Sequence, residues 1–91
     1  MNYFVLIYYV VADYVNRRVP FREEHLNLAR ESQARGDLLM GGALVEPVDR
    51  ALLIFRCSDR SIVESFVARD PYVANALVMR WEIRPWAVVI H

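Results

Sequence analysis

The chain opens, at residues 3–12, with the run YFVLIYYVVA, in which every side chain is apolar or aromatic. The run is much shorter than the roughly 20 residues that a membrane-spanning helix needs, and the first basic residue, Arg17, comes only after it. Its β-branched and aromatic residues are typical of a strand, and we expect neither a targeting segment nor a membrane helix here. The predicted strand has two apolar faces, formed by Phe4, Leu6, Tyr8 and Val10 on one side and by Tyr3, Val5, Ile7 and Tyr9 on the other.

The remaining sequence alternates between helical and strand patterns. An amphipathic helical pattern follows Asp13 and ends at Gly36, a residue type that commonly closes helices. Later boundaries are marked by a turn at Pro47 and by capping residues before each apolar helical stripe. The further expected elements are strands at 38–45 and 51–57, a helix from Ser58 or Asp59, a short helix from Pro71 to about Leu77, and a last strand over 81–90 that Pro85 kinks, bulges or places at an edge.

This order predicts an α+β domain of the ferredoxin-like type, β-α-β-β-α-β, over residues 1–91. Two helices would cover one face of a four-stranded antiparallel sheet, and they cannot cover the other face as well. Because the first and third strands are apolar on both faces, an apolar surface would remain open, which is uncommon on a lone domain. We therefore predict a homodimer in which two open sheet faces pack about 10 Å apart, as a dimeric α+β barrel.

The amino-acid composition excludes several kinds of binding partner and of chemistry. The 91 residues are 56% hydrophobic, and 11 arginines balance 11 carboxylates without a single lysine. The zero net charge gives no basic excess for nucleic acid, and the missing lysine excludes Schiff-base chemistry on a lysine side chain. Cys57 is the only cysteine, so no internal disulfide is possible, and a reducing, cytoplasmic location is expected. His25, His91 and scattered carboxylates form no metal motif, and we expect no metal and no cofactor.

His25 is the most informative residue. At 100° per residue it shares the apolar arc of the first helix with Phe21 and Leu28, where a leucine would be the simpler choice, while Arg30 falls on the opposite side. Histidine is the side chain that titrates near neutral pH, which favours a general base or acid. The alternative is a structural histidine that is hydrogen-bonded inside the core.

Asp70 is the natural partner of His25. A carboxylate that accepts a hydrogen bond from one ring nitrogen fixes the tautomer and leaves the other nitrogen as a base. An aspartate before Pro71 is equally a good helix N-cap. The two roles are compatible, because a carboxylate has two oxygens.

Several other residues are weaker candidates for a small-molecule site. Arg22 could bind a substrate carboxylate or be a solvated helix residue, and Tyr72 could lend its hydroxyl or only pack. Gly41 and Gly42 could let a ligand approach the backbone, although a bulge that shapes the sheet explains them equally well. Tyr8 could line a cavity for a flat ligand or belong to the core.

Four segments resemble the YciI-like (YCII-related) family in order and spacing over essentially the whole chain. They are REEHL at 22–26, GDLLMGG at 36–42, DPYV at 70–73 and WEIRPW at 81–86. The resemblance implies a ferredoxin-like protomer, a dimeric α+β barrel and a site built on a histidine and an aspartate, which here are His25 and Asp70. The loop from Val45 to Ala51 is shorter than in many family members, so the mouth of the pocket is expected to differ.

The leading hypothesis is an enzyme in which His25, oriented by Asp70, transfers a proton on a small organic acid or cyclic metabolite. Isomerisation or elimination next to a carbonyl fits such a pair best. One alternative is a non-catalytic binding or regulatory module that holds a metabolite in the same cavity. Another is a cofactor-independent monooxygenase, since the superfamily implied by the resemblance contains such enzymes beside muconolactone isomerases.

Overall fold

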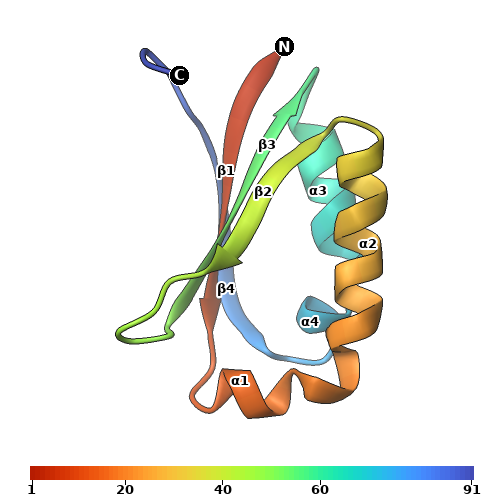
Figure 1. The fold of residues 1–91 in the computed structure, drawn as a ribbon, viewed down its shortest axis with the longest axis vertical. Coiled ribbons are helices and arrows are strands. Elements are labelled where there is room, and N and C mark those ends of the chain that lie inside the picture. The colour runs from red at the N-terminus through yellow and green to blue at the C-terminus, as the bar shows by residue number, and fades with distance from the viewer.

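The computed structural model describes all 91 residues as one antiparallel sheet with helices on a single face (Figure 1). The sheet order is β2-β3-β1-β4, which confirms the predicted ferredoxin-like arrangement. The elements are β1 Asn2–Val10, α1 Tyr14–Arg17, a 3-10 turn Val19–Phe21, α2 Arg22–Ala34, β2 Leu38–Ala43, β3 Arg50–Cys57, α3 Arg60–Arg69, α4 Pro71–Ala74 and β4 Val78–Pro85.

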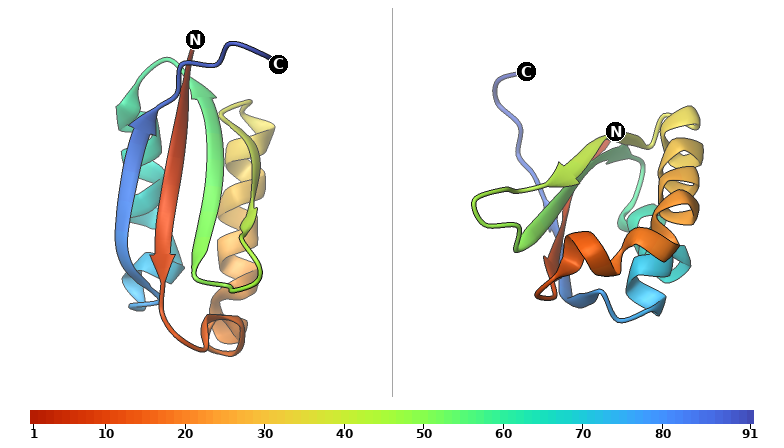
Figure 2. Two further views of the ribbon diagram at one scale, coloured as in Figure 1. Left: turned by 90° about the vertical axis from the view of Figure 1, so that its left-hand side faces the viewer. Right: turned by 60° about the horizontal axis from the view of Figure 1, so that its bottom comes forward.

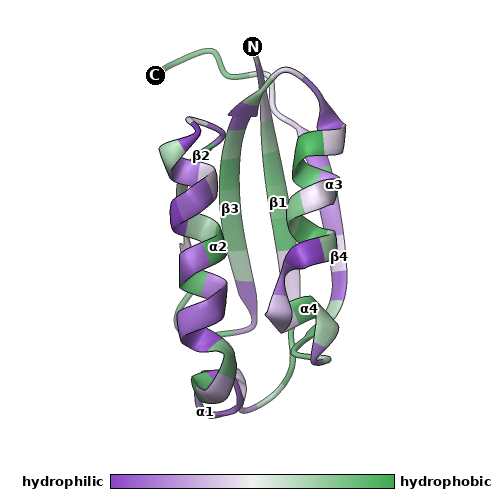
Figure 3. Ribbon diagram, turned by 90° about the vertical axis from the view of Figure 1, so that its right-hand side faces the viewer, coloured by the Kyte–Doolittle hydropathy of each residue, from purple (hydrophilic) through white to green (hydrophobic).

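The two-faced character of β1 is visible in its burial. Phe4, Leu6, Tyr8 and Val10 are buried beneath the helices, whereas the residues between them are only half-buried on the other face. Figure 3, viewed from the helix side, shows the apolar strands β1 and β3 behind the gap between α2 and α3, whose polar residues face the viewer. The core therefore sits between the sheet and the helical layer.

The helical layer is fixed by local capping and by aromatic packing. The Asp59 carboxylate accepts a hydrogen bond from the Ser61 amide at 2.6 Å and so begins α3. Phe66 of α3 then packs edge-to-face on Phe55 of β3, with ring centroids 5.4 Å apart. This contact holds α3 against the centre of the sheet.

Several predicted boundaries were wrong. The first helical region is divided by the turn around Pro20, so that α1 and α2 are separate helices. The last strand begins at Val78 and ends at Pro85, not at Ile90. Its pairing with β1 reaches Phe4 opposite Pro85, and beyond it only the Trp86 amide still donates to β1, at 2.9 Å to the Tyr3 carbonyl. The short helix ends at Ala74 rather than at Leu77.

The two glycines of β2 differ from each other. The strand ends at Ala43, two residues before its predicted end, and its irregular pairing lies between Leu38 and Met40, upstream of the glycines. A Cβ on Gly41 would lie 3.3 Å from Leu53 Cγ, so the predicted close approach exists there. A Cβ on Gly42 would meet nothing within 4 Å.

No helix covers the second face of the sheet (Figure 2). Val5 and Ile7 of β1 and Leu52 and Ile54 of β3 lie there half-buried, and the chain after β4 runs along one end of this face. No helix in the fold combines the length and the apolar content that crossing a bilayer requires.

Candidate active site

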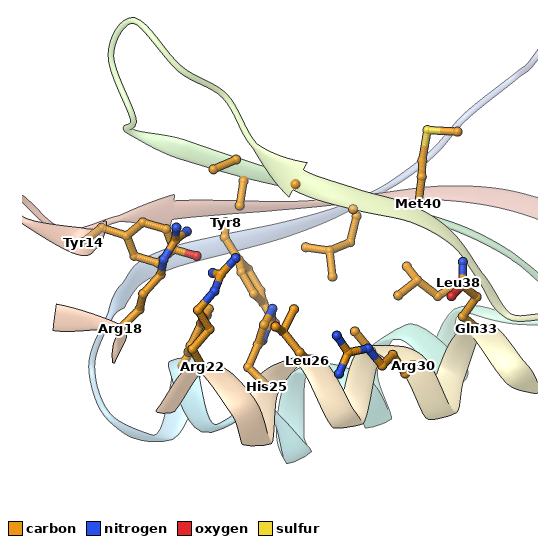
Figure 4. A pocket seen from close by; sticks show the side chains of 17 residues that line it. Tyr8, Tyr14, Arg18, Arg22, His25, Leu26, Arg30, Gln33, Leu38 and Met40 are labelled. Carbon is orange, nitrogen blue, oxygen red and sulfur yellow. The ribbon is translucent and has the colours of Figure 1, made fainter. Parts of the chain in front are cut away.

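A pocket of about 270 Å³ lies between the start of the helical layer and the sheet (Figure 4). Its walls come from α1, α2 and α4 on one side and from β1, β2 and β3 on the other. The fold thereby brings together six of the seven residues predicted for the site, namely Tyr8, Arg22, His25, Gly41, Gly42 and Tyr72. The seventh, Asp70, lies behind the wall and is fully buried.

His25 and Asp70 are in direct contact although they are 45 positions apart in the chain. The distance from His25 Nδ1 to Asp70 Oδ1 is 2.8 Å, and 13% of the His25 side chain remains exposed. Residue 25 lies in the first turn of α2, and residue 70 lies at the junction of α3 and α4. The junction exists because Pro71 begins a new helix, for which Asp70 in an extended conformation is the N-cap.

Asp70 is held by three hydrogen bonds. Its Oδ1 accepts one from the Tyr72 amide at 3.0 Å in addition to the contact with His25, and its Oδ2 accepts one from the Tyr8 hydroxyl at 2.8 Å. The cap and the histidine partner are therefore the same side chain. Burial raises the pKa of Tyr8, and the nearby Asp70 charge raises it further, so this hydroxyl stays protonated and donates.

This network fixes which nitrogen of His25 carries the proton. A carboxylate only accepts hydrogen bonds, so Nδ1 is the donor toward Asp70. The other nitrogen, Nε2, then keeps a free lone pair. In chemical terms, Nε2 of a neutral imidazole held in this way can accept a proton, and the buried carboxylate beside Nδ1 would stabilise the resulting cation.

Aromatic rings fix the plane of the imidazole. The Tyr72 ring stacks on His25 with centroids 3.8 Å apart and planes 6° from parallel, and Tyr14 meets the Tyr72 ring edge-on at 5.7 Å. The Tyr72 hydroxyl is buried and has no hydrogen-bond partner. Burial raises the pKa of Tyr72, an effect that the nearby Arg22 guanidinium partly offsets.

Tyr14, Arg18 and Arg30 are among the pocket residues that were not predicted as site residues. Tyr14 and Arg18 belong to α1 and its end, and no pattern in the sequence indicated that this turn would fold back over the site. Arg30 was placed on the outer side of the first helix, yet its long side chain lies along the pocket wall. Its spacing from Arg22, eight residues or about two turns, is the signal that could have found it.

No group of three or more histidine, cysteine, aspartate or glutamate side chains is arranged to hold a metal ion. The donor set at the site is one imidazole and one carboxylate that already contact each other. Nε2 of His25, the ring nitrogen that does not contact Asp70, belongs to a side chain that lines the pocket.

A comparison with protein families bears on this pair. A family model described as the YCII-related domain matches residues 1–87. The chain belongs to this family. Among curated protein sequences, none matches this YCII-related chain significantly.

Solved structures resemble the YCII-related fold over nearly its full length. A 5-chloro-2-hydroxyhydroquinone dehydrochlorinase (TftG) from Burkholderia phenoliruptrix AC1100, solved in complex with 2,5-dihydroxybenzoquinone, superposes with a TM-score of 0.78 at 18% identity, covering 92% of each chain. An antibiotic biosynthesis monooxygenase superposes with a TM-score of 0.60 at 13% identity, covering 99% of this chain and all of its own. At such identities the likeness establishes the shared fold, and the chemistry has to be argued from the site.

Proposed function

We propose that this protein is a small-molecule enzyme in which His25 transfers protons as a general base and acid. The observation that carries the proposal is the 2.8 Å contact between His25 Nδ1 and a fully buried Asp70 at the wall of a pocket. In the proposed reaction Nε2 takes a proton from the carbon next to a substrate carbonyl, and Asp70 stabilises the imidazolium that forms.

Two outcomes follow from that step. In an isomerisation His25 returns the proton to a different atom of the same substrate. In an elimination the electron pair of the broken C–H bond expels a leaving group, and His25 releases its proton to solvent. The name of the neighbour TftG, a dehydrochlorinase, describes a reaction of the second kind and supports this reaction class for the shared fold.

The tautomer of His25 tests the proposal directly. We expect neutral His25 to carry its proton on Nδ1, with Nε2 unprotonated, because Asp70 can only accept. Long-range ¹H–¹⁵N NMR spectra of the imidazole rings distinguish the two forms. His91, exposed at the end of the chain, is the internal control and should show the tautomer mixture of free histidine. A proton on Nε2 of neutral His25 would leave no base facing the substrate and would contradict the proposal.

We further propose that the enzyme is a homodimer that pairs its open sheet faces. The half-buried Ile7 and Leu52 lie opposite each other at the centre of this face, and no helix covers them. One end of the face is charged: Tyr9 donates a hydrogen bond to Glu82, and Arg80 lies over the Tyr9 ring. A second copy supplies both an apolar centre and groups of both charges, so it complements this surface.

Sedimentation at micromolar concentration should therefore give twice the 10.6 kDa mass of the chain. Leu52→Glu places a charge at the centre of the proposed interface and should yield monomers. Val15→Glu makes the same kind of change on an exposed helical residue and should remain dimeric. A wild-type chain that sediments as a monomer would show that this face is not a dimer interface.

A further inference from the structure

None of the three arginines that line the pocket forms an ion pair, which is true outside the pocket only of Arg17, Arg56 and Arg84. Five of the eleven arginines form ion pairs with a carboxylate, and all five lie outside the pocket. Arg18, Arg22 and Arg30 line the pocket, and none of them has an acidic partner. In a chain of zero net charge, this concentrates positive charge at one site.

No acidic side chain lines the pocket to balance these guanidinium groups. Asp70, the carboxylate that contacts His25, is fully buried and already accepts hydrogen bonds from Tyr8, Tyr72 and His25. A guanidinium has only donors, and the hydroxyl oxygens of Tyr14 and Tyr72 beside Arg18 and Arg22 can accept only part of them, so the three arginines still need further acceptors. Water or a bound anion has to supply them.

The Tyr72 hydroxyl adds a second, independent sign of a missing acceptor. It is the one buried side-chain polar atom without a hydrogen-bond partner, and Tyr72 is only 1% exposed. A buried donor without a partner is costly, and natural proteins keep few of them. Arg22 and Arg18 are its charged neighbours, and neither has an acceptor to offer.

The unsatisfied donors are held in place at one end of the pocket. The Arg18 guanidinium lies over the Tyr14 ring at 5.1 Å, a cation–π contact that limits its motion. Figure 4 shows Arg18 and Arg22 reaching into the same end of the pocket near Tyr14, with Arg30 further along α2 beyond His25. Two guanidinium groups therefore lie at one end of the pocket, next to the imidazole on which the Tyr72 ring stacks.

We propose that the pocket binds a small organic carboxylate, whose carboxylate group accepts hydrogen bonds from Arg18, Arg22 and the Tyr72 hydroxyl. The inference rests on the proposed use of this pocket as the substrate site, and it names the substrate class. Planar guanidiniums match a carboxylate with paired hydrogen bonds, which fix the orientation of the molecule as well as its position. The carbon skeleton then extends past Nε2 of His25, toward the apolar wall formed by Leu38 and Leu53.

The volume suits a molecule of about the size of a single ring. A cavity of roughly 150 Å³ holds benzene, so the 270 Å³ here has room for a six-membered ring with a carboxylate. Benzoate and its neutral isostere benzamide are therefore matched probes, because they differ in charge but hardly in shape. Calorimetric titration at low salt measures the affinity for each probe and does not require that the protein convert it.

We expect benzoate to bind at least about tenfold more tightly than benzamide, since two charge-assisted contacts are lost with the amide. Arg22→Gln should weaken benzoate binding by about tenfold or more and leave benzamide unchanged. Arg17→Gln removes the same charge from an exposed neighbour outside the pocket and should change neither affinity by more than about twofold. Tyr72→Phe, which removes one oxygen, should weaken benzoate binding by a few-fold.

Equal affinity for benzoate and benzamide, or no saturable binding of benzoate at millimolar concentration, would overturn the inference. An equal loss of benzoate affinity in Arg17→Gln and Arg22→Gln would also overturn it. Such a result would show that benzoate responds only to the overall electrostatic potential of the protein and not to a specific contact with Arg22. Failure of the acid/base proposal can be distinguished from failure of this inference. In the first case NMR would show the wrong His25 tautomer, while the protein would still prefer benzoate to benzamide. His25→Gln should keep that preference.

Discussion

Asp70→Ala should lower the free energy of unfolding by about 3–5 kcal/mol, the largest stability effect of any polar residue in the fold. The substitution removes the acceptor of the buried Tyr8 hydroxyl, of the Tyr72 amide and of His25 Nδ1 at once. None of the three has another hydrogen-bond acceptor in the structure, so each is left unsatisfied or has to find a new partner such as water. Urea denaturation at fixed protein concentration measures the loss.

Asp59→Ala is the matched control for this prediction. Asp59 and Asp70 both cap a helix through a backbone amide two residues ahead, but Asp59 lies on the surface and holds no further donors. Its substitution should therefore cost much less. Asp70→Asn, which keeps one acceptor oxygen and can reorient its amide toward the Tyr8 oxygen, should fall between the two. If Asp59→Ala and Asp70→Ala were equally destabilising, the cap alone would account for Asp70.

Much of the fold was predictable because strand patterns and helix caps are local signals. The alternation in residues 3–10 sorted the side chains of β1 correctly into two faces, although it did not indicate which face the helices cover. The Asp-Pro pair at 70–71 correctly marked a helix boundary. The end of β4 was not predictable in this way, because it depends on how far the strand stays paired with β1 beyond Pro85, a property of the two strands together and not of residues 86–90 alone.

The candidate site was also predictable only in part, where local sequence patterns indicated its residues. His25 stood out because a polar residue on an apolar arc needs a partner, and the resemblance indicated Asp70 as that partner. The tyrosines were harder: Tyr8 was considered as a cavity-lining residue and does line the pocket, but no sequence pattern indicated that its hydroxyl also donates to Asp70. Arg18 could not be predicted as a site residue, because its place in the pocket depends on how α1 packs next to the first turn of α2.

One network therefore serves both stability and the proposed chemistry. The hydrogen bonds that hold Asp70 in the core are the ones that orient His25 toward the pocket. Tyr8→Phe separates the two roles in part, because it removes one donor to Asp70 and leaves the histidine contact intact. This variant should be more stable than Asp70→Ala, and its His25 should keep the same tautomer.

Proton transfer itself should fall by about 10²- to 10⁴-fold in His25→Ala, the range typical of a lost general base. The reaction can be followed without knowing the natural substrate, as deuterium exchange into the carbon next to a carbonyl. Suitable probes are 2-oxobutyrate and levulinate, which carry a carboxylate, and cyclopentanone, which does not. In D₂O, ¹H NMR records the loss of each signal with time.

The pattern of exchange across variants decides between the alternatives. Because the lost group is an imidazole stacked on Tyr72, added imidazole should restore part of the exchange in His25→Ala and none in Asp70→Ala, where the orienting carboxylate is gone. Wild-type protein that binds the carboxylates but exchanges no proton would favour a non-catalytic binding module. Oxygen consumption with an electron-rich phenol, unaffected by loss of His25, would favour a monooxygenase. Exchange that disappears with His25 and returns with imidazole requires the histidine itself to carry the proton, because neither a binding module nor an oxygenase would depend on it in that way.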